Sequence, residues 1–244
     1  MKILSHQLLL IPAFLFAGKV MAQQPATNDY DPKAKTILDD VSKTAKSYST
    51  ITAEFTITTK KTDGTSDSKD GTIVLKGSKY KLTLNTKVKD KMYAEEYYND
   101  GKTTWAYVQK DNEVTIDNAP DPNKKKEGTF SVSDIFSDPA KGFKYRFIKE
   151  ETLNGKVVQQ IELYPEKPDK KNYHTIKLTI DKVKKQVISA VQVNNDQSTI
   201  TYTIKKFTPN LDVPDSTFQF DKKTHPGVKA IDLREDDDDG DSAK

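Results

Sequence analysis

The chain has 244 residues, of which 34% are hydrophobic and 31% are charged, and it contains no cysteine. No run of about 20 apolar residues occurs outside the N-terminus, which excludes a protein with several membrane-spanning helices. Without cysteine, disulfide staples and cysteine-ligated metals are excluded. The formal net charge of +3 is too balanced for a nucleic-acid-binding protein.

The N-terminus has the pattern of an export signal. Lys2 provides a positive charge, Leu8 to Ala17 is an apolar run, and Val20-Met21-Ala22 offers small residues at a cleavage position. We therefore expect residues 1–22 to be a signal peptide and the mature protein to reach the periplasm. The alternative is a buried N-terminal helix.

A polar leader at residues 23–30, which we expect to be flexible, precedes an amphipathic helix. Pro32 suits the first turn of that helix, and its apolar residues recur at 3.6-residue spacing. These residues are Ala34, Ile37, Leu38, Val41 and Ala45.

From Tyr48 the apolar period changes to two, which is typical of a strand with one buried face. Ile51, Ala53, Phe55 and Ile57 alternate with polar residues. A two-residue turn fixes which side chains face each other across a hairpin. A turn at Gly77-Ser78 thus places Leu75 opposite Tyr80 and Ile73 opposite Leu82.

Two further turns predict hairpin registers. Asp100-Gly101 as the turn places Glu96 opposite Trp105, and Asn195-Asp196 as the turn places Val191 opposite Ile200. The same registers pair Tyr98 with Thr103, Ala94 with Tyr107, Ser189 with Tyr202 and Val187 with Ile204. A tight turn at Asn154-Gly155 would pair apolar with polar residues, so we expect a bulge or a longer loop there.

Further strands are predicted at Phe143–Ile148, Val157–Tyr164 and His174–Ile180, for a total of about eleven. Sheets of about ten strands tend to curl. One domain at residues 31–234, mainly β with a helical lid (α+β), is therefore expected to form an incomplete antiparallel β-barrel over an apolar cavity closed by short helices. A packed β-sandwich remains the alternative. Residues 235–244 form an acidic tail that we expect to be disordered.

No catalytic pattern is present, so we expect no enzyme, cofactor or metal site. His174 alternates with apolar residues on a predicted strand, where partial burial is the simplest interpretation, and His225 lies in a turn. Lysine clusters at 124–126, 170–171 and 184–185 fit either solubility and edge protection or docking to an anionic surface.

Several segments, in order, resemble the outer-membrane lipoprotein carrier family, the LolA-type periplasmic chaperones. After the helix come Tyr48–Phe55, Gly71–Lys76 and the Asn99–Tyr107 hairpin, which matches the family's DGKTLWxY segment. Phe218–Phe220, His225–Val228 and Ile231–Arg234 follow. The resemblance implies an unclosed antiparallel barrel with a helical lid over an apolar cavity.

The resemblance also implies a function. Such a carrier is expected to take acylated lipoproteins from an inner-membrane ABC-type release complex and deliver them to an outer-membrane receptor or membrane surface, working as a monomer. The alternative is a lipid-binding periplasmic signalling regulator on the same fold. The family's basic-Pro pair after the second strand is replaced here by Gly77-Ser78, so Lys76 and Lys79 are the candidates for its role in hand-over.

The candidate cavity residues are the apolar side chains that alternate on the predicted strands. For the wall we expect Phe55, Ile57, Ile73, Leu75, Tyr80, Leu82, Leu84, Met92, Tyr98, Trp105, Tyr107, Val191, Ile200 and Tyr202. For the lid we expect Leu38, Val41, Phe130, Ile135 and Phe136. Glu96 is a carboxylate on the apolar side in this arrangement, which places it at the mouth of the cavity unless the register differs.

Overall fold

The computed structural model describes residues 29–120 and 130–234. The expected signal peptide, most of the leader, the acidic tail and the lysine cluster at 124–126 lie outside these residues. Within the described ranges, no helix is long and apolar enough to cross a membrane.

Helix α1 (Pro32–Lys46) begins where the sequence predicts. The carboxylate of Asp31 accepts hydrogen bonds from the backbone N–H groups of Lys33 (2.8 Å) and Ala34 (3.2 Å), which caps the first turn. The apolar stripe of α1 is buried against the sheet, with Leu38 only 1% exposed.

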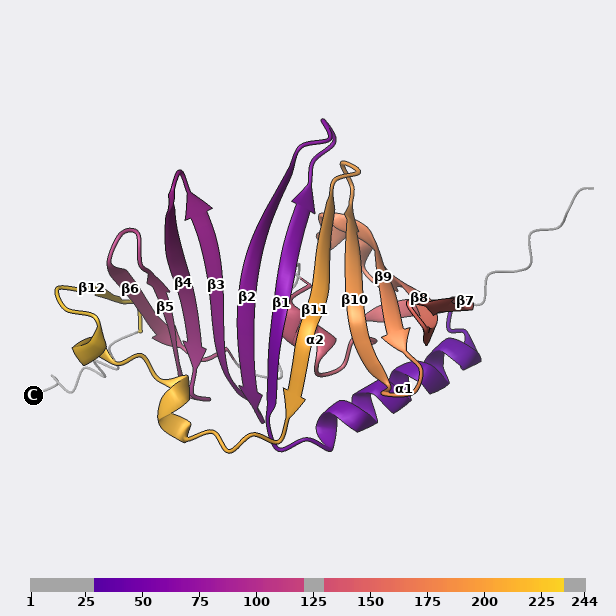
Figure 1. Ribbon diagram of the computed structural model, residues 1–244, viewed down its shortest axis with the longest axis horizontal. Helices are drawn as coiled ribbons and strands as arrows, with labels where there is room; N and C mark the ends of the chain where they lie inside the picture. The colour runs from indigo at the N-terminus through magenta and orange to yellow at the C-terminus, as the bar shows by residue number, and fades with distance from the viewer. Residues whose placement is uncertain (1–28, 121–129, 235–244) are drawn as a thin grey trace, which may run out of the picture.

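All described strands belong to one sheet, in the order β12-β6-β5-β4-β3-β2-β1-β11-β10-β9-β8-β7 (Figure 1). Neighbours pair antiparallel except β12 with β6. The strands are β1 (Ile51–Lys60), β2 (Ser66–Lys76), β3 (Lys79–Val88), β4 (Lys91–Asn99), β5 (Thr103–Val108), β6 (Glu113–Asn118), β7 (Phe143–Leu153), β8 (Lys156–Pro165), β9 (Tyr173–Asp181), β10 (Gln186–Asn194), β11 (Thr199–Pro209) and β12 (Lys229–Asp232).

The sheet is open, because β7 and β12 form its two edges and do not pair with each other. This confirms the expected class, an incomplete antiparallel barrel with short helices. It has twelve strands rather than about eleven. The four-residue β12 shows no alternating pattern and exists because the C-terminal chain returns along β6.

One face of the sheet, which we call the inner face, carries Ala53, Phe55 and Ile73 and packs against both α-helices. The second helix, α2 (Val132–Ile135), is a single turn. A reciprocal capping box between Ser131 and Asp134 holds its start. Three 3-10 turns complete the secondary structure: η1 (Pro168–Lys170), η2 (Asp215–Phe218) and η3 (Lys222–Thr224).

Of the predicted hairpin registers, the one at Gly77-Ser78 is confirmed: Leu75 pairs with Tyr80 and Ile73 with Leu82. The register at Asp100-Gly101 is wrong by two residues. The side chains of Asn99 and Asp100 accept hydrogen bonds from three loop N–H groups and widen the loop. Tyr98 therefore lies opposite Trp105, and Glu96 opposite Tyr107.

The register predicted at Asn195-Asp196 is wrong by one residue. Gln197, with φ at 70°, adds a third loop residue, so Tyr202 pairs with Ala190 and Val191 with Thr201. Because successive side chains point to opposite faces, this slip moves Val191 to the outer face. The turn at Asn154-Gly155 is tight after all, because Leu153 pairs with Lys156, and the expected bulge lies farther along the hairpin, between Phe147 and Lys149.

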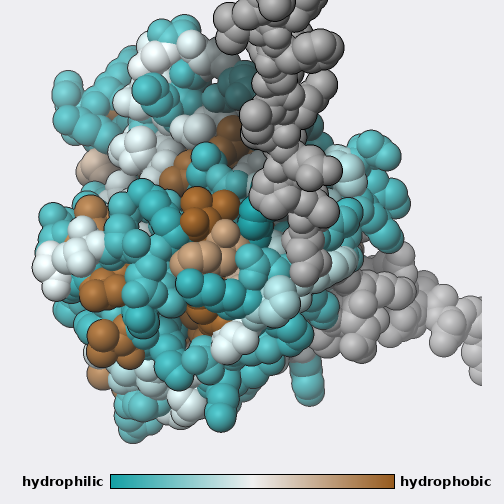
Figure 2. Space-filling view, turned by 90° about the vertical axis from the view of Figure 1, so that its right-hand side faces the viewer, coloured by the Kyte–Doolittle hydropathy of each residue, from teal (hydrophilic) through white to brown (hydrophobic). Residues whose placement is uncertain are grey.

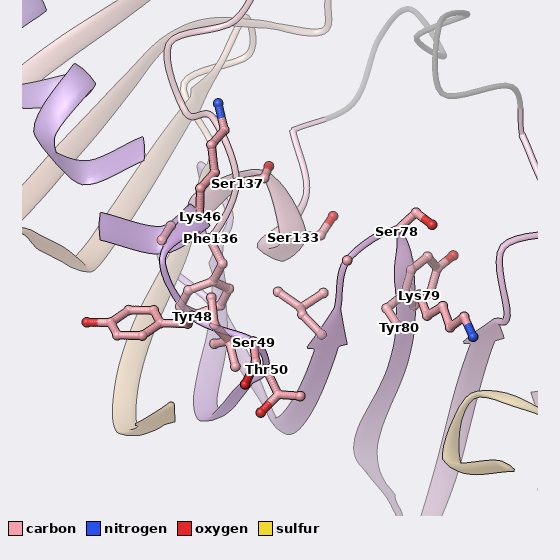
Figure 3. A pocket seen from close by; sticks show the side chains of 14 residues that line it. Lys46, Tyr48, Ser49, Thr50, Ser78, Lys79, Tyr80, Ser133, Phe136 and Ser137 are labelled. Carbon is pink, nitrogen blue, oxygen red and sulfur yellow. The ribbon is translucent and has the colours of Figure 1, made fainter. Parts of the chain in front are cut away.

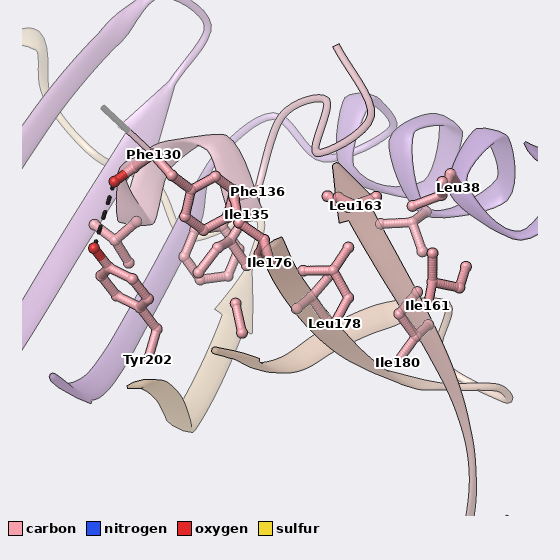
Figure 4. Packing of buried hydrophobic residues seen from close by; sticks show 14 of the residues in the cluster. Leu38, Phe130, Ile135, Phe136, Ile161, Leu163, Ile176, Leu178, Ile180 and Tyr202 are labelled. Atoms are coloured by element: carbon pink, nitrogen blue, oxygen red, sulfur yellow. Dashed lines mark hydrogen bonds between the residues drawn. The ribbon is translucent and has the colours of Figure 1, made fainter. Parts of the chain in front are cut away.

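The main core fills the inner face over β7 to β10, beneath α1 (Figure 4). Ile161, Leu163, Ile176 and Ile180 are each 0% exposed there. Seen from the side of α1 and β7, the surface shows apolar side chains only as patches among hydrophilic ones (Figure 2). This half of the sheet is a packed core with a largely polar exterior.

Candidate functional site

The inner face continues past β1 onto β2, β3 and β4, whereas α1 packs against β7 and β10 in the other half. Ile73 of β2 pairs with Leu82 of β3, and Leu82 pairs with Tyr97 of β4, so all three side chains lie on the inner face. Leu82 and Tyr97 are only partly buried, as are Ile57 and Leu84. Apolar side chains therefore line a concave surface that the other described residues leave incompletely covered.

A cavity of about 360 Å³ lies on this surface, within the range of about 300–1,000 Å³ common for small-ligand sites. The segment from Phe130 to Ser133 forms its far wall. The strand residues that line it are Ile57, Ile73, Tyr80, Leu82, Leu84, Tyr97 and Tyr202. Among the described residues, no charged side chain lines this cavity, so the site favours an apolar ligand over an ionic one.

A second cavity of about 460 Å³ adjoins the first and shares Tyr80 and Ser133 with it. Phe136 and Ser133 lie on one side and Ser78 to Tyr80 on the other (Figure 3). Its remaining lining residues are Ala45, Lys46, Tyr48, Ser49, Thr50, Ile51, Leu75, Gly77 and Ser137. This cavity is therefore more polar than the first, with hydroxyl groups beside Leu75 and Phe136.

Tyr202 ties the far wall of the apolar cavity to the sheet. Its hydroxyl donates a hydrogen bond to the backbone oxygen of Phe130 (3.4 Å), and the two rings meet edge to face (Figure 4). Burial, together with the nearby carboxylate of Asp134, raises the pKa of Tyr202 to about 12. The phenol is therefore neutral and able to donate at physiological pH.

Three aromatic residues that the sequence analysis placed in the wall, Tyr98, Trp105 and Tyr107, lie on the outer face instead. Tyr97 is the residue of β4 that pairs with Leu82 on the inner face, so the adjacent Tyr98 points the other way. Tyr107 forms a second core with Val114 and Val228, and Trp105 and Phe220 pack against it. Glu96 shares this outer face and accepts the hydrogen bond of Tyr98 (2.7 Å).

Two other wall residues also lie elsewhere. Met92 is 58% exposed near the start of β4 and lies six residues before Tyr98 on that strand, so it faces outward as Tyr98 does. Val191 faces outward for the reason given above. Phe55, Leu75 and Ile200 lie on the inner face, with Phe55 buried between the two halves and Leu75 in the second cavity.

The five residues predicted for the lid are all buried, but they cover different parts of the molecule. Leu38 and Val41 belong to α1, which contacts β7 and β10 and closes the packed half. Phe130 lines the apolar cavity and Phe136 the second one, whereas Ile135 packs into the core. The structure thus brings Phe130 and Phe136 to the cavities and places Leu38 and Val41 away from them.

Lys76 and Lys79 bind Asp215 with their ammonium groups, at 2.9 and 2.6 Å. These two lysines lower the pKa of the Asp215 carboxyl to about 2. They hold the start of the C-terminal strap, residues 210–228, which runs beneath β2 to β5 before β12 (Figure 1). The lysines proposed for hand-over therefore have a structural partner.

Neither histidine in the described residues lines either of the two cavities. His174 is exposed, which corrects the expected partial burial. His225 packs between the rings of Tyr107 and Phe220, and its Nε2 lies 3.7 Å from Glu96. The described residues contain no group of three or more His, Asp or Glu side chains able to hold a metal ion.

No family model and no curated protein matches this chain. An uncharacterized conserved protein from Thermus thermophilus has a similar solved structure (TM-score 0.54, 11% identity), covering 82% of this chain and 99% of that one. A putative outer membrane lipoprotein-sorting protein domain from Vibrio parahaemolyticus (TM-score 0.46, 12% identity) covers 79% and 97%. A LolA superfamily protein from Nitrosomonas europaea (TM-score 0.42, 12% identity) covers 78% and 98%.

These similarities concern the fold and not an activity. The Thermus protein matches over nearly its whole length, so its fold is the fold of this chain. Structures with LolA and lipoprotein-sorting names occur among the similar ones.

Proposed function

We propose that this protein is a periplasmic carrier that shields the acyl chains of lipoproteins and ferries them from the inner to the outer membrane. The observation that carries the proposal is the cavity on the open half of the inner face, whose lining among the described residues is uncharged. Leu82, Leu84 and Tyr97 give it an apolar wall, on a half of the sheet against which α1 does not pack. The resemblance in sequence points to the same function.

The physical chemistry of such a transfer is consistent with this site. Burial of an acyl chain is worth about 0.8 kcal/mol per CH₂, so two or three long chains hold a lipoprotein in its bilayer by tens of kcal/mol. Spontaneous extraction is negligible, and an ABC-type release complex of the inner membrane would supply the energy. The carrier needs an apolar cavity from which the chains can leave again, at an outer-membrane receptor or at the membrane itself.

The second cavity suits the polar end of the same cargo. Acyl chains of a lipoprotein are joined through ester and amide groups, which accept hydrogen bonds. Ser133 lines both cavities, and Ser78 lines the second one. The chains would occupy the apolar cavity while these hydroxyls donate to the polar linkage.

Native mass spectrometry tests the proposal directly. The mature protein is mixed with a triacylated lipoprotein and with its unacylated version, and a one-to-one complex is expected only with the acylated form. Leu82→Gln, which places an amide in the cavity, should weaken the complex about tenfold. Thr83→Gln is the matched control, because Thr83 is the next residue of β3 and faces outward.

Equal binding of both lipoprotein forms, or equal effects of the two variants, would refute the cavity as the acyl site. Depletion in cells tests the transport step: lipoproteins should accumulate at the inner membrane. If acylated cargo binds but lipoproteins still reach the outer membrane, the alternative of a lipid-binding regulator replaces the carrier.

A further inference from the structure

The turn between β3 and β4 exposes apolar side chains to solvent. We call Lys87–Met92 the β3–β4 tip. All six of its residues are exposed, and among them Val88 is 37% and Met92 58% exposed. Figure 1 shows this turn at the upper rim, apart from the turn between β1 and β2. Two large apolar side chains thus stand in solvent on one short hairpin end.

The same tip carries a local excess of positive charge. Lys87, Lys89 and Lys91 surround a single acidic residue, Asp90. None of the three lysines forms an ion pair with a described residue. By contrast Lys81, lower on β3, faces Glu96 (3.9 Å). The cationic groups of the tip therefore remain available to an external partner.

The position of the tip connects it with the cavity. Leu84 lines the apolar cavity, and Val88 follows it by four residues on the same strand, a rise of about 13 Å. Tyr97 of β4 lines the cavity as well. The tip is thus the projecting end of the two strands that form one wall of the cavity.

We propose that the β3–β4 tip docks on an anionic phospholipid bilayer. Val88 and Met92 enter the headgroup region, and the three lysines bind lipid phosphates. A narrow tip with apolar side chains needs no complementary pocket in a fluid interface, whereas a folded acidic protein would have to offer one. Lysines near an anionic membrane surface each add to the attraction. This inference goes beyond the carrier function and does not require bound cargo.

Co-sedimentation of the mature protein with lipid vesicles tests the inference. We expect binding to vesicles of phosphatidylethanolamine with phosphatidylglycerol, weaker binding at high salt, and little binding to phosphatidylcholine alone. Replacing Lys87, Lys89 and Lys91 by Gln should weaken binding by about fivefold for each lysine. Val88→Ser combined with Met92→Ser should reduce binding while leaving the protein folded, because both side chains are exposed.

Val183→Ser is the matched control. Val183 is 84% exposed in the turn between β9 and β10 and lies between Lys182 and Lys184. The control should bind vesicles like the wild type, and all variants should form the acyl-chain complex in native mass spectrometry. Equal loss in the control, or binding independent of anionic lipid, overturns the proposal. Failure of the wild type to bind anionic vesicles also overturns it and makes an acidic protein surface the better partner.

Discussion

The two halves of the inner face belong to one continuous sheet, but they differ in how far their apolar side chains are buried. Over β7 to β10, α1 presses Leu38 and Val41 onto the strands, and Leu163 is 0% exposed. Over β2 to β4 the equivalent face carries Leu82 and Leu84, which remain partly exposed around a cavity. The difference lies in what covers the sheet, not in the strands themselves.

The two halves therefore contribute differently to folding stability and to ligand binding. A side chain that is fully packed contributes its whole transfer free energy to folding, whereas one beside a cavity contributes only part of it. The packed half should therefore stabilise the fold, while the open half should retain apolar surface for a ligand. The two halves share Phe55, which lies at their junction on β1.

The largest expected effect is a loss of stability in the packed half. Leu163→Ala should lower the free energy of unfolding by about 3 kcal/mol, because it empties a fully packed position. Leu84→Ala makes the same chemical change in the open half and should cost about 1 kcal/mol or less. Urea denaturation of both variants measures the difference. Equal losses would contradict the division between the halves.

The sequence predicts the packed half and the open sheet well, because both depend on local pattern. The 3.6-residue period of α1 and the turn at Gly77-Ser78 are local signals, and both appear as predicted. Asp-Gly and Asn-Asp look like two-residue turns, but capping by Asn99 and Asp100 and the positive φ of Gln197 lengthen them. These additional hydrogen bonds cannot be read from apolar alternation.

The cavity wall is harder to predict for a related reason. Tyr97 and Tyr98 are adjacent, and either could face inward on β4. The choice depends on the turn at Lys89-Asp90, which aligns Tyr97 with Leu82. That turn contains neither Gly nor Asn, so the pattern does not mark its length. A register shift of one residue at this turn would move the aromatic side chains of β4 to the opposite face of the sheet.

A substitution at Gly71 tests how tightly Phe55 packs where the two halves of the inner face meet. A Cβ at this position would lie 2.5 Å from Cζ of Phe55 and 2.9 Å from Cδ2 of Leu84. Gly71→Ala should therefore cost about 2 kcal/mol, since the Phe55 ring must move. Adding Phe55→Leu should make the double variant cost less than the sum of the two single changes, measured by urea denaturation. Additive costs would show that the ring is not held against β2.

A smaller effect is expected from the hydrogen bond across the open half. Tyr202→Phe removes the donor to the Phe130 oxygen and should cost about 1 kcal/mol at pH 7. In the wild type the pKa of Tyr202 is raised to about 12, from about 10 in the unfolded chain. The neutral phenol therefore stabilises the fold fully below pH 10, and this contribution is lost as the pH rises to 12. Unfolding free energies measured across this range should converge for variant and wild type, and a constant difference would contradict the assignment.

The smallest effect concerns the outer face, where the strap covers a second core behind the open half. Lys79 and Lys76 hold the pKa of Asp215 at about 2, below its unfolded value of about 3.9. A depressed carboxyl pKa means that the contact is fully formed above pH 4 and is lost as the pH falls toward 2. Trp105, the single tryptophan of the chain, packs in this outer core and reports on the strap by its fluorescence. Asp215→Asn should remove the part of the fluorescence change between pH 4 and 2 that comes from this contact, whereas Asp212→Asn in the same segment should keep it. If both variants titrate like the wild type, the two lysines do not fasten the strap, and the outer core alone holds it behind the cavity.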